Sequence, residues 1–131
     1  MELKLDAIAP VFLVKDVRRA AEYYRDRLGF SLTEYFGEPP AFTIVRRDAV
    51  RIALRRADDV TGASNRVRKT EGFDAYIWVS DVDALYQQFL TNKAPVSGPP
   101  ELQVYGIREI WIRDLDGYVV TFGQFVNPSA D

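Results

Sequence analysis

The tetrapeptide Val14–Val17 (VKDV) returns as Val79–Val82 (VSDV), a shift of 65 residues from position 14 to position 79. Each copy follows a mainly apolar run and precedes a segment whose apolar side chains recur at helical spacing. A second pair, Phe42–Leu54 (FTIVRRDAVRIAL) and Ile110–Phe122 (IWIRDLDGYVVTF), repeats at a shift of 68 residues from position 42 to position 110. The chain is therefore predicted to contain two similar units in tandem.

Each unit is expected to run strand, helix and then three strands. The carboxylates of Asp16 and Asp81 are predicted to cap the two helices at their first residues, and Gly29 is placed to end the first helix in a left-handed conformation. The expected strands are 5–14, 30–36, 41–47 and 50–55, and then 73–79, 103–105, 107–113 and 118–125. The predicted boundaries are 1–60 for the first unit, 61–72 for a polar, charged linker and 73–131 for the second unit.

Composition narrows the classes of function. A chain of 131 residues that is 47% apolar fits one compact domain. A net charge of −2 disfavours a nucleic-acid partner. No segment approaches the roughly 20 apolar residues that span a bilayer, and the start MELKLD lacks a signal-peptide pattern, so no membrane partner and a cytoplasmic location are expected.

Cysteine and histidine are both absent. Disulfides, thiolate nucleophiles and zinc–sulfur sites are therefore excluded. The commonest metal ligand and the commonest general base are missing as well. Any metal would need a shell made of oxygen ligands, and a carboxylate with a raised pKa would have to act as a base.

Three segments resemble the vicinal oxygen chelate superfamily, which includes glyoxalase I, extradiol dioxygenases and the fosfomycin and bleomycin resistance proteins. These segments are Val14–Phe30 (VKDVRRAAEYYRDRLGF), Val79–Phe89 (VSDVDALYQQF) and Tyr105–Gln124 (YGIREIWIRDLDGYVVTFGQ), with Leu115 where the family usually has proline. The resemblance implies an α+β fold of two βαβββ modules in tandem, whose mixed sheets curl around a central cleft.

The resemblance also implies where a metal would bind. Metal-using members place two ligands in each module, at positions that correspond here to Ala9, Ala53, Asp74 and Thr121. Two methyl groups, one hydroxyl and one carboxylate cannot hold a divalent cation by themselves. We therefore expect no metal and no cofactor, and chemistry of the glyoxalase or dioxygenase type is disfavoured.

Strand alternation predicts what lines the cleft instead, because side chains two residues apart share a face. The predicted ligand-binding residues are Phe42, Ile44, Arg46, Arg51, Asp74, Tyr76, Trp78, Val119 and Thr121. Trp78 could equally be a packing residue, and packing is favoured for Trp111. Asp74 could bind a ligand, pair with Arg46 or Arg51, or lie at a solvated strand end, and Arg108 could neutralise Asp114 or an anionic ligand.

Three functions fit these residues. The first is a metal-free protein that binds an aromatic or amphipathic small molecule, as bleomycin resistance proteins do by sequestration. The second is a metal-independent isomerase or lyase in which Asp74 or Tyr76 acts as acid or base. The third is a structural or regulatory dimer without a ligand. In each case a homodimer is expected, because half-sheets expose edges.

Overall fold

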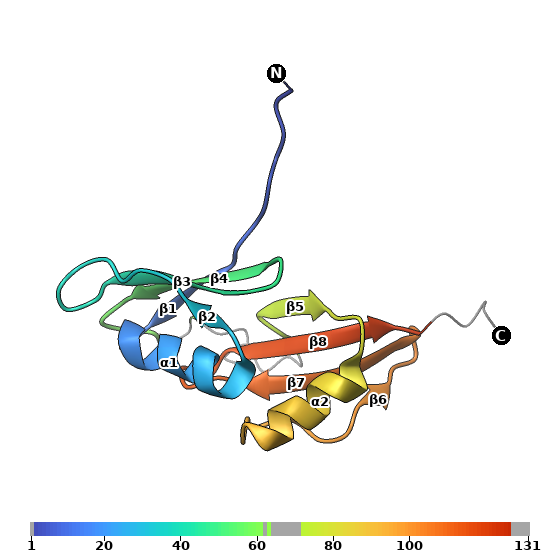
Figure 1. The fold of residues 1–131 in the computed structure, drawn as a ribbon. Helices are drawn as coiled ribbons and strands as arrows, with labels where there is room; N and C mark the ends of the chain where they lie inside the picture. Colours follow the sequence, from blue (N-terminus) through green and yellow to red (C-terminus); the bar gives the residue numbers. More distant parts are fainter. Residues whose placement is uncertain (1, 62, 64–71, 127–131) are drawn as a thin grey trace.

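The computed structural model describes residues 2–61, 63 and 72–126, and it repeats one βαβββ order twice (Figure 1). The first module consists of β1 (Val11–Val14), α1 (Val17–Leu28), β2 (Ser31–Leu32), β3 (Phe42–Arg47) and β4 (Val50–Arg56). The second module consists of β5 (Ala75–Trp78), α2 (Val82–Thr91), β6 (Glu101–Leu102), β7 (Ile107–Arg113) and β8 (Val119–Phe125). The predicted linker 61–72 lies, apart from residues 61, 63 and 72, outside the described residues.

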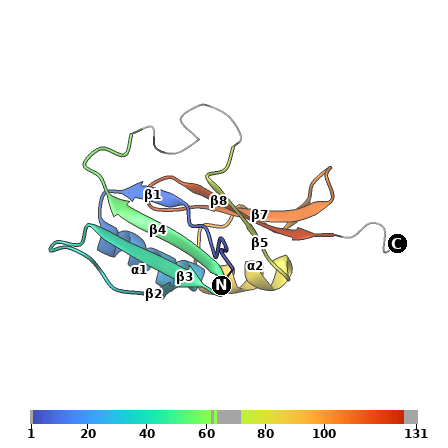
Figure 2. The same cartoon turned by 90° about the horizontal axis from the view of Figure 1, so that it is seen from above.

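Each module folds into its own four-stranded mixed sheet, with strand orders β1-β4-β3-β2 and β5-β8-β7-β6. The two sheets lie side by side, and each helix lies against one face of its own sheet (Figures 1 and 2). Their registers correspond, because Val11 is opposite Ala53 in the first sheet and Tyr76 is opposite Thr121 in the second. The predicted α+β fold with tandem βαβββ modules is confirmed.

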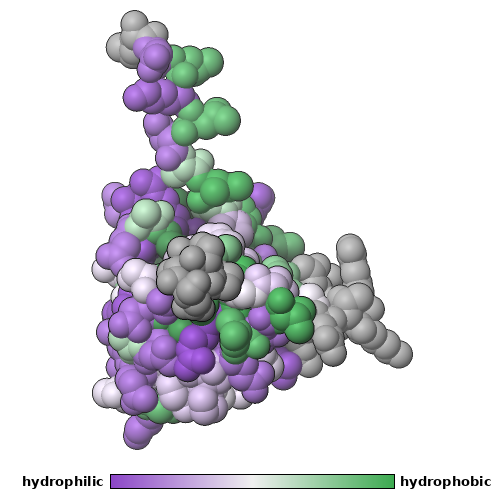
Figure 3. Space-filling model, turned by 90° about the vertical axis from the view of Figure 1, so that its right-hand side faces the viewer, coloured by the Kyte–Doolittle hydropathy of each residue, from purple (hydrophilic) through white to green (hydrophobic). Residues whose placement is uncertain are grey.

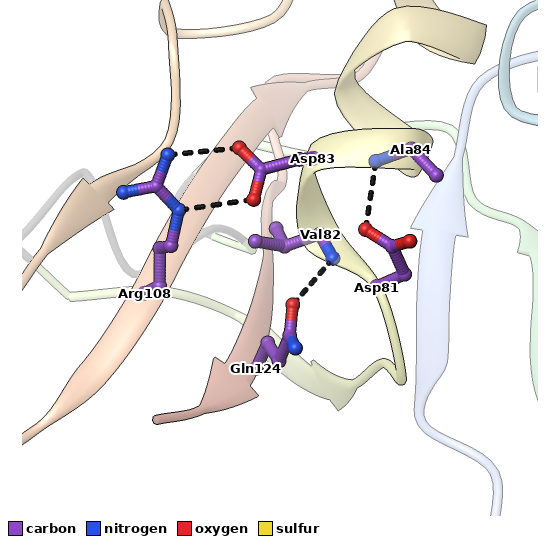
Figure 4. Close-up of polar contacts among 6 residues, drawn as sticks. All are labelled: Asp81, Val82, Asp83, Ala84, Arg108 and Gln124. Carbon is purple, nitrogen blue, oxygen red and sulfur yellow. Dashed lines mark hydrogen bonds and ion pairs between the residues drawn. The ribbon is translucent and has the colours of Figure 1, made fainter. Parts of the chain in front are cut away.

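The helix boundaries follow the predicted capping chemistry. The Asp16 carboxylate accepts a hydrogen bond from the Arg19 amide at 3.0 Å, and the Asp81 carboxylate accepts one from the Ala84 amide at 3.0 Å (Figure 4). Gly29 ends α1 with φ 78°, a conformation that costs glycine little. Both N-cap predictions and the Gly29 prediction are therefore confirmed.

The core lies between the helices and the sheet faces that they cover. Aliphatic and aromatic side chains alternate inward along each central strand, as the period of two requires. The largest fully buried side chains are Tyr24, Phe89, Leu28, Ile52, Leu54, Ile110, Ile112, Val14, Val17, Val45, Val82 and Val120. Neither helix among the described residues has the length and apolar character needed to cross a bilayer.

Three predicted strands are shorter or displaced. The segment predicted as strand 5–14 is paired only at Val11–Val14, because no strand among the described residues pairs with the chain before Pro10. The segment predicted as strand 30–36 keeps only Ser31–Leu32. A strand at 103–105 is wrong: β6 ends at Leu102, and a turn closed by the Gly106 amide on the Gln103 carbonyl follows.

Residues 2–10 therefore form an extended N-terminal arm that projects away from both sheets (Figure 1). Apolar side chains stand out along this arm, and Figure 3 shows their green atoms above the body of the molecule. Leu3 and Leu5 are 96% and 99% exposed, and Ile8 is 89% exposed. The arm consequently leaves apolar surface in contact with solvent.

Polar contacts from the β7–β8 turn join the second module to the first. The Tyr118 ring stacks on Phe12 with centroids 4.2 Å apart, and its hydroxyl bonds both the amide and the carbonyl of Leu13. Asp114 is buried and accepts a hydrogen bond from the Tyr24 hydroxyl at 2.7 Å. Burial raises the pKa of Asp114 to about 6, although the Tyr24 hydroxyl and two backbone amides favour the charged form.

Candidate functional site

Each sheet has one face packed against its helix and one open face directed away from it. In β5, Ile77 packs against the core, whereas Tyr76 and Trp78 alternate onto the open face, where Trp78 is 59% exposed. Val120 and Phe122 are buried on the helix side of the neighbouring strand. The pleat therefore points Tyr76 and Trp78 in the direction that strand alternation predicts.

The open face of the first sheet is apolar at its centre and cationic along β3 and β4. Ile44 lies opposite Ala53, which in turn lies opposite Val11, and Phe42 lies opposite Arg55. Arg46 lies directly opposite Arg51, and both are exposed. Like charges in this position repel, so this face is a place where an anion or an acidic surface would be favoured.

The open face of the second sheet carries a continuous cluster of aromatic rings. Ring centroids lie 5.1 Å apart for Phe73 and Tyr76, 5.0 Å for Tyr76 and Trp78, and 6.5 Å for Trp78 and Phe125. The cluster bounds a hollow of about 410 Å³, which we call the aromatic pocket. Its lining residues are Phe73, Tyr76, Trp78, Tyr105 and Ile107.

A carboxylate that the sequence reasoning missed lies beside this pocket. Glu109 Oε2 accepts hydrogen bonds from the hydroxyls of Tyr76 and Tyr105, each at 2.6 Å. Burial first, and then the bond to Glu109, raises the pKa of Tyr76 well above its usual value, and the bond to Glu109 raises that of Tyr105 to about 12. Both phenols therefore stay protonated at neutral pH and donate to Glu109.

Gly123 makes this arrangement possible. It pairs with Trp78 on one side and with Glu109 on the other, so it lies between the strands that carry Tyr76 and Glu109. A Cβ atom at position 123 would collide with the Tyr76 ring and its hydroxyl. Strand alternation places Gly123 on the same face of β8 as Thr121. Extending the same alternation to β7 would have placed Glu109 there too.

Asp74 has a structural partner. Its Oδ2 accepts a hydrogen bond from the Val119 amide at 2.9 Å, and its own amide donates to the Val119 carbonyl at 2.8 Å. This double contact joins the chain before β5 to the start of β8, whereas Arg46 and Arg51 lie on the other sheet. The carboxylate thus bonds backbone in place of the ion pair that was one of the sequence alternatives.

The predicted site residues do not all meet in one hollow. Tyr76 and Trp78 line the aromatic pocket, whereas Asp74 lines a separate hollow of about 260 Å³ beside β1. Val119 and Thr121 are almost fully buried. Phe42, Ile44, Arg46 and Arg51 belong to the first sheet. A ligand-binding role for these residues stays a prediction.

Another hollow, of about 450 Å³, lies between the β3–β4 turn and α2. Two of its polar groups are already engaged: Arg47 donates to the Leu28 carbonyl at 2.7 Å, and Asp81 caps α2. We favour the smaller aromatic pocket as the binding site, because it combines exposed rings with a carboxylate that has no ion-pair partner among the described residues.

Arg108 has a structural role on the opposite side of the sheet. Its guanidinium donates to both carboxylate oxygens of Asp83 on α2, at 2.8 and 3.2 Å (Figure 4). Gln124, on the same side, accepts a hydrogen bond from the Val82 amide at 2.9 Å (Figure 4). The suggested pairing of Arg108 with Asp114 is wrong, because β7 directs Arg108 toward α2 while Asp114 lies in the β7–β8 turn.

The family's metal positions do not fit a metal. Ala53 and Thr121 occupy equivalent registers in the two sheets, yet one offers a methyl group and the other a hydroxyl. Asp74 already accepts a backbone hydrogen bond, and Ala9 has no donor atom in its side chain. Across residues 2–61, 63 and 72–126, no group of three or more acidic, histidine or cysteine side chains could hold a metal ion.

Comparison with known proteins shows which family the sequence matches. The sequence model of the Glyoxalase/Bleomycin resistance protein/Dioxygenase superfamily matches residues 4–122. No curated protein matches the sequence.

Several solved structures share the fold. A bleomycin-binding protein from Streptomyces verticillus, complexed with copper(II)-bleomycin, is 25% identical, with 96% of this chain and 99% of that chain covered and a TM-score of 0.71. A bleomycin resistance determinant encoded on the transposon Tn5 is 20% identical over 92% and 98% of the chains, with a TM-score of 0.72. A glyoxalase-related enzyme from Clostridium phytofermentans is 18% identical over 95% and 98%, with a TM-score of 0.73. Because the family match covers most of its length, this chain belongs to the glyoxalase/bleomycin resistance protein/dioxygenase superfamily.

Proposed function

We propose that this chain is a metal-free small-molecule-binding protein of the glyoxalase/bleomycin resistance type, which holds an aromatic or amphipathic ligand on the open face of its second sheet. The observation that carries the proposal is the exposed aromatic cluster around Tyr76 and Trp78. Burying a large apolar side chain stabilises a protein by about 1.5–3 kcal/mol, and rings that stay exposed on a sheet face do not gain this stabilisation. Contiguous exposed rings of this kind mark a binding surface.

The comparisons support a binding role over the alternatives. The Streptomyces verticillus protein is a bleomycin-binding protein, and its fold matches over nearly the whole of both chains. The isomerase or lyase alternative has less support, because the Tyr76 hydroxyl donates to Glu109 and the Asp74 carboxylate accepts from Val119. Both groups already take part in hydrogen bonds, which disfavours an acid or base role for either.

We also propose that two copies associate. The arm with Leu3, Leu5 and Ile8 exposes apolar side chains to solvent. The two open faces carry opposite character, since one presents Arg46 and Arg51 and the other presents Glu109 among aromatic rings. Burial of the apolar arm and attraction between the two faces would both favour a homodimer.

A thermal-shift screen tests the proposed function. Neutral aromatic heterocycles such as quinoline should raise the melting temperature, because a ligand that binds only the folded chain stabilises it. Nickel, zinc, manganese and magnesium should leave it unchanged, because two of the family's four metal positions are alanines and the Asp74 carboxylate already accepts a backbone hydrogen bond. A shift with a stoichiometric divalent metal, or no shift with any aromatic compound, would contradict the proposal.

A further inference from the structure

Glu109 is a charged side chain beside the aromatic pocket whose hydrogen bonds occupy one of its two carboxylate oxygens. Both tyrosine hydroxyls donate to Oε2, at 2.6 Å each. Within residues 2–61, 63 and 72–126, no hydrogen bond reaches Oε1 and no lysine or arginine pairs with Glu109. The Glu109 carboxylate therefore lies close to the rings with one oxygen available for a ligand.

Among the described residues, the surroundings of Glu109 add negative charge, and no cation pairs with it. Glu101 lies directly opposite Glu109 in the β6–β7 register. The nearest arginine in the chain, Arg108, faces away and bonds Asp83 (Figure 4). Arg113, at the far end of β7, lies over the Trp111 ring at 5.7 Å. A cation bound at the pocket would relieve the repulsion between the two glutamates.

The walls of the pocket suit the same charge. Trp78 and Tyr105 are 59% and 55% exposed, and Tyr76 lies between the rings of Phe73 and Trp78. The faces of aromatic rings carry negative quadrupolar potential and attract ammonium and guanidinium groups. Neutral aromatic stacking alone would not require a carboxylate oriented by two tyrosines.

We propose that the aromatic pocket selects an organic cation, a small molecule with an ammonium or guanidinium group that contacts Glu109 and the faces of Trp78 and Tyr105. This inference rests on the proposed binding function and adds the charge of the ligand to it. The absence of a side chain at Gly123 lets Tyr76 reach Glu109, so the carboxylate is held in place before a ligand arrives.

A matched pair of probes tests the charge directly. Choline and 3,3-dimethyl-1-butanol have almost the same shape, but only choline is charged. Each is titrated into the full-length Trp111→Phe protein, in which Trp78 is the single tryptophan. Choline should quench Trp78 fluorescence saturably and bind about tenfold more tightly than the alcohol, a factor between those of an exposed and a desolvated cation–π contact. Equal affinities would overturn the inference.

Two variants assign the effect to Glu109. Glu109→Gln keeps an oxygen for the tyrosine hydroxyls and removes the charge, so choline affinity should fall about tenfold. Glu101→Gln, the matched control on the neighbouring strand, should have a smaller effect. Unchanged choline binding in Glu109→Gln would contradict the proposal. If Glu109→Gln does not fold, the comparison of choline with 3,3-dimethyl-1-butanol at the unsubstituted site still tests the preference for a cation.

Quinoline, a neutral aromatic probe, separates this inference from the proposed function. Quenching of Trp78 by quinoline without a preference for choline over its neutral analogue would leave the binding function standing and overturn the cation preference. Failure of quinoline and choline alike would overturn both.

Discussion

At the scale of single residues, Gly123 decides how closely two functional side chains approach. Tyr76 reaches across it to Glu109, and a Cβ atom at this position would occupy the space of the phenol ring. The sequence shows the glycine and its face. It does not show the reach of Tyr76, because that depends on side-chain torsions and on the spacing of three strands. Alternation along β7 could have placed Glu109 on this face, but not its hydrogen bond with Tyr76.

Gly123→Ala should therefore destabilise the protein by about 1–3 kcal/mol, the usual cost of forcing extra volume into a packed contact. Denaturant unfolding measures it. In a Tyr76→Ala background the same substitution should cost clearly less, because the colliding ring is gone. Equal costs in both backgrounds would show that the two positions do not interact.

Asp114 is the residue that makes stability depend on pH at the junction of the modules. Its folded pKa of about 6 lies above the model-peptide value of 3.8, so the folded chain holds a proton that the unfolded chain releases between these values. The stability contributed by the protonated carboxyl is full below pH 4 and is lost as pH rises through 6. The Tyr24 hydroxyl and two backbone amides limit this loss.

Asp114→Asn removes the titration while keeping an oxygen for the amides. Relative to the unsubstituted protein, this variant should gain roughly 2 kcal/mol of stability between pH 4 and pH 7. Urea unfolding at a series of pH values checks it. Asp26→Asn, at an exposed ion pair with Arg25, is the control and should show no such gain. A constant difference between Asp114→Asn and the unsubstituted protein across this range would refute the assignment.

At the scale of elements, the capping residues and the repeat predicted most of the architecture. Helix α1 begins after Asp16 and ends at Gly29, and α2 begins after Asp81, as the capping chemistry predicts. These boundaries can be predicted because a capping residue bonds groups close to it in the sequence. Strand lengths were less predictable, because a strand ends where its partner ends. The arm before Pro10 has strand-like composition but has no paired strand within the described residues.

The start of helix α2 allows two contacts to be compared, one made by Asp81 and one by Asp83 (Figure 4). Asp81→Ala removes the N-cap bond to Ala84 and should cost about 1 kcal/mol. Asp83→Ala removes the ion pair with Arg108 and should cost less, because both side chains are exposed and solvent screens them. Thermal unfolding of the two variants measures the order. The opposite order would mean that the ion pair contributes more to α2 than its cap does.

At the scale of the whole molecule, two open sheet faces and an apolar arm face solvent in one chain. The predicted lining residues do not share one hollow, since Phe42 and Ile44 lie on one sheet and Tyr76 and Trp78 on the other. Strand alternation predicted which side chains lie on the open face of each sheet. It could not predict how the two sheets lie relative to each other, because that arrangement depends on contacts between the modules, such as the stacking of Tyr118 on Phe12.

Light scattering at micromolar concentration should give twice the 14.9 kDa mass of one chain. Association would bury the apolar side chains of the arm and bring surfaces of opposite character together. Leu5→Asp, at a position 99% exposed in the single chain, should shift the mass toward one chain, because burying its charge is costly. A mass of 14.9 kDa for the unsubstituted protein would contradict the dimer.

The central claim is that the open face of the second sheet binds small molecules without a metal, and the most direct test is a fluorescence titration with quinoline in the presence of excess EDTA. Trp111→Phe leaves Trp78 as the only tryptophan, so the tryptophan signal comes from a ring of the aromatic cluster. The account predicts saturable quenching that EDTA does not alter, with affinity weakened by about 1–3 kcal/mol when a ring of the cluster is removed by Tyr76→Ala. Quenching that does not saturate, or that disappears on chelation, would contradict it.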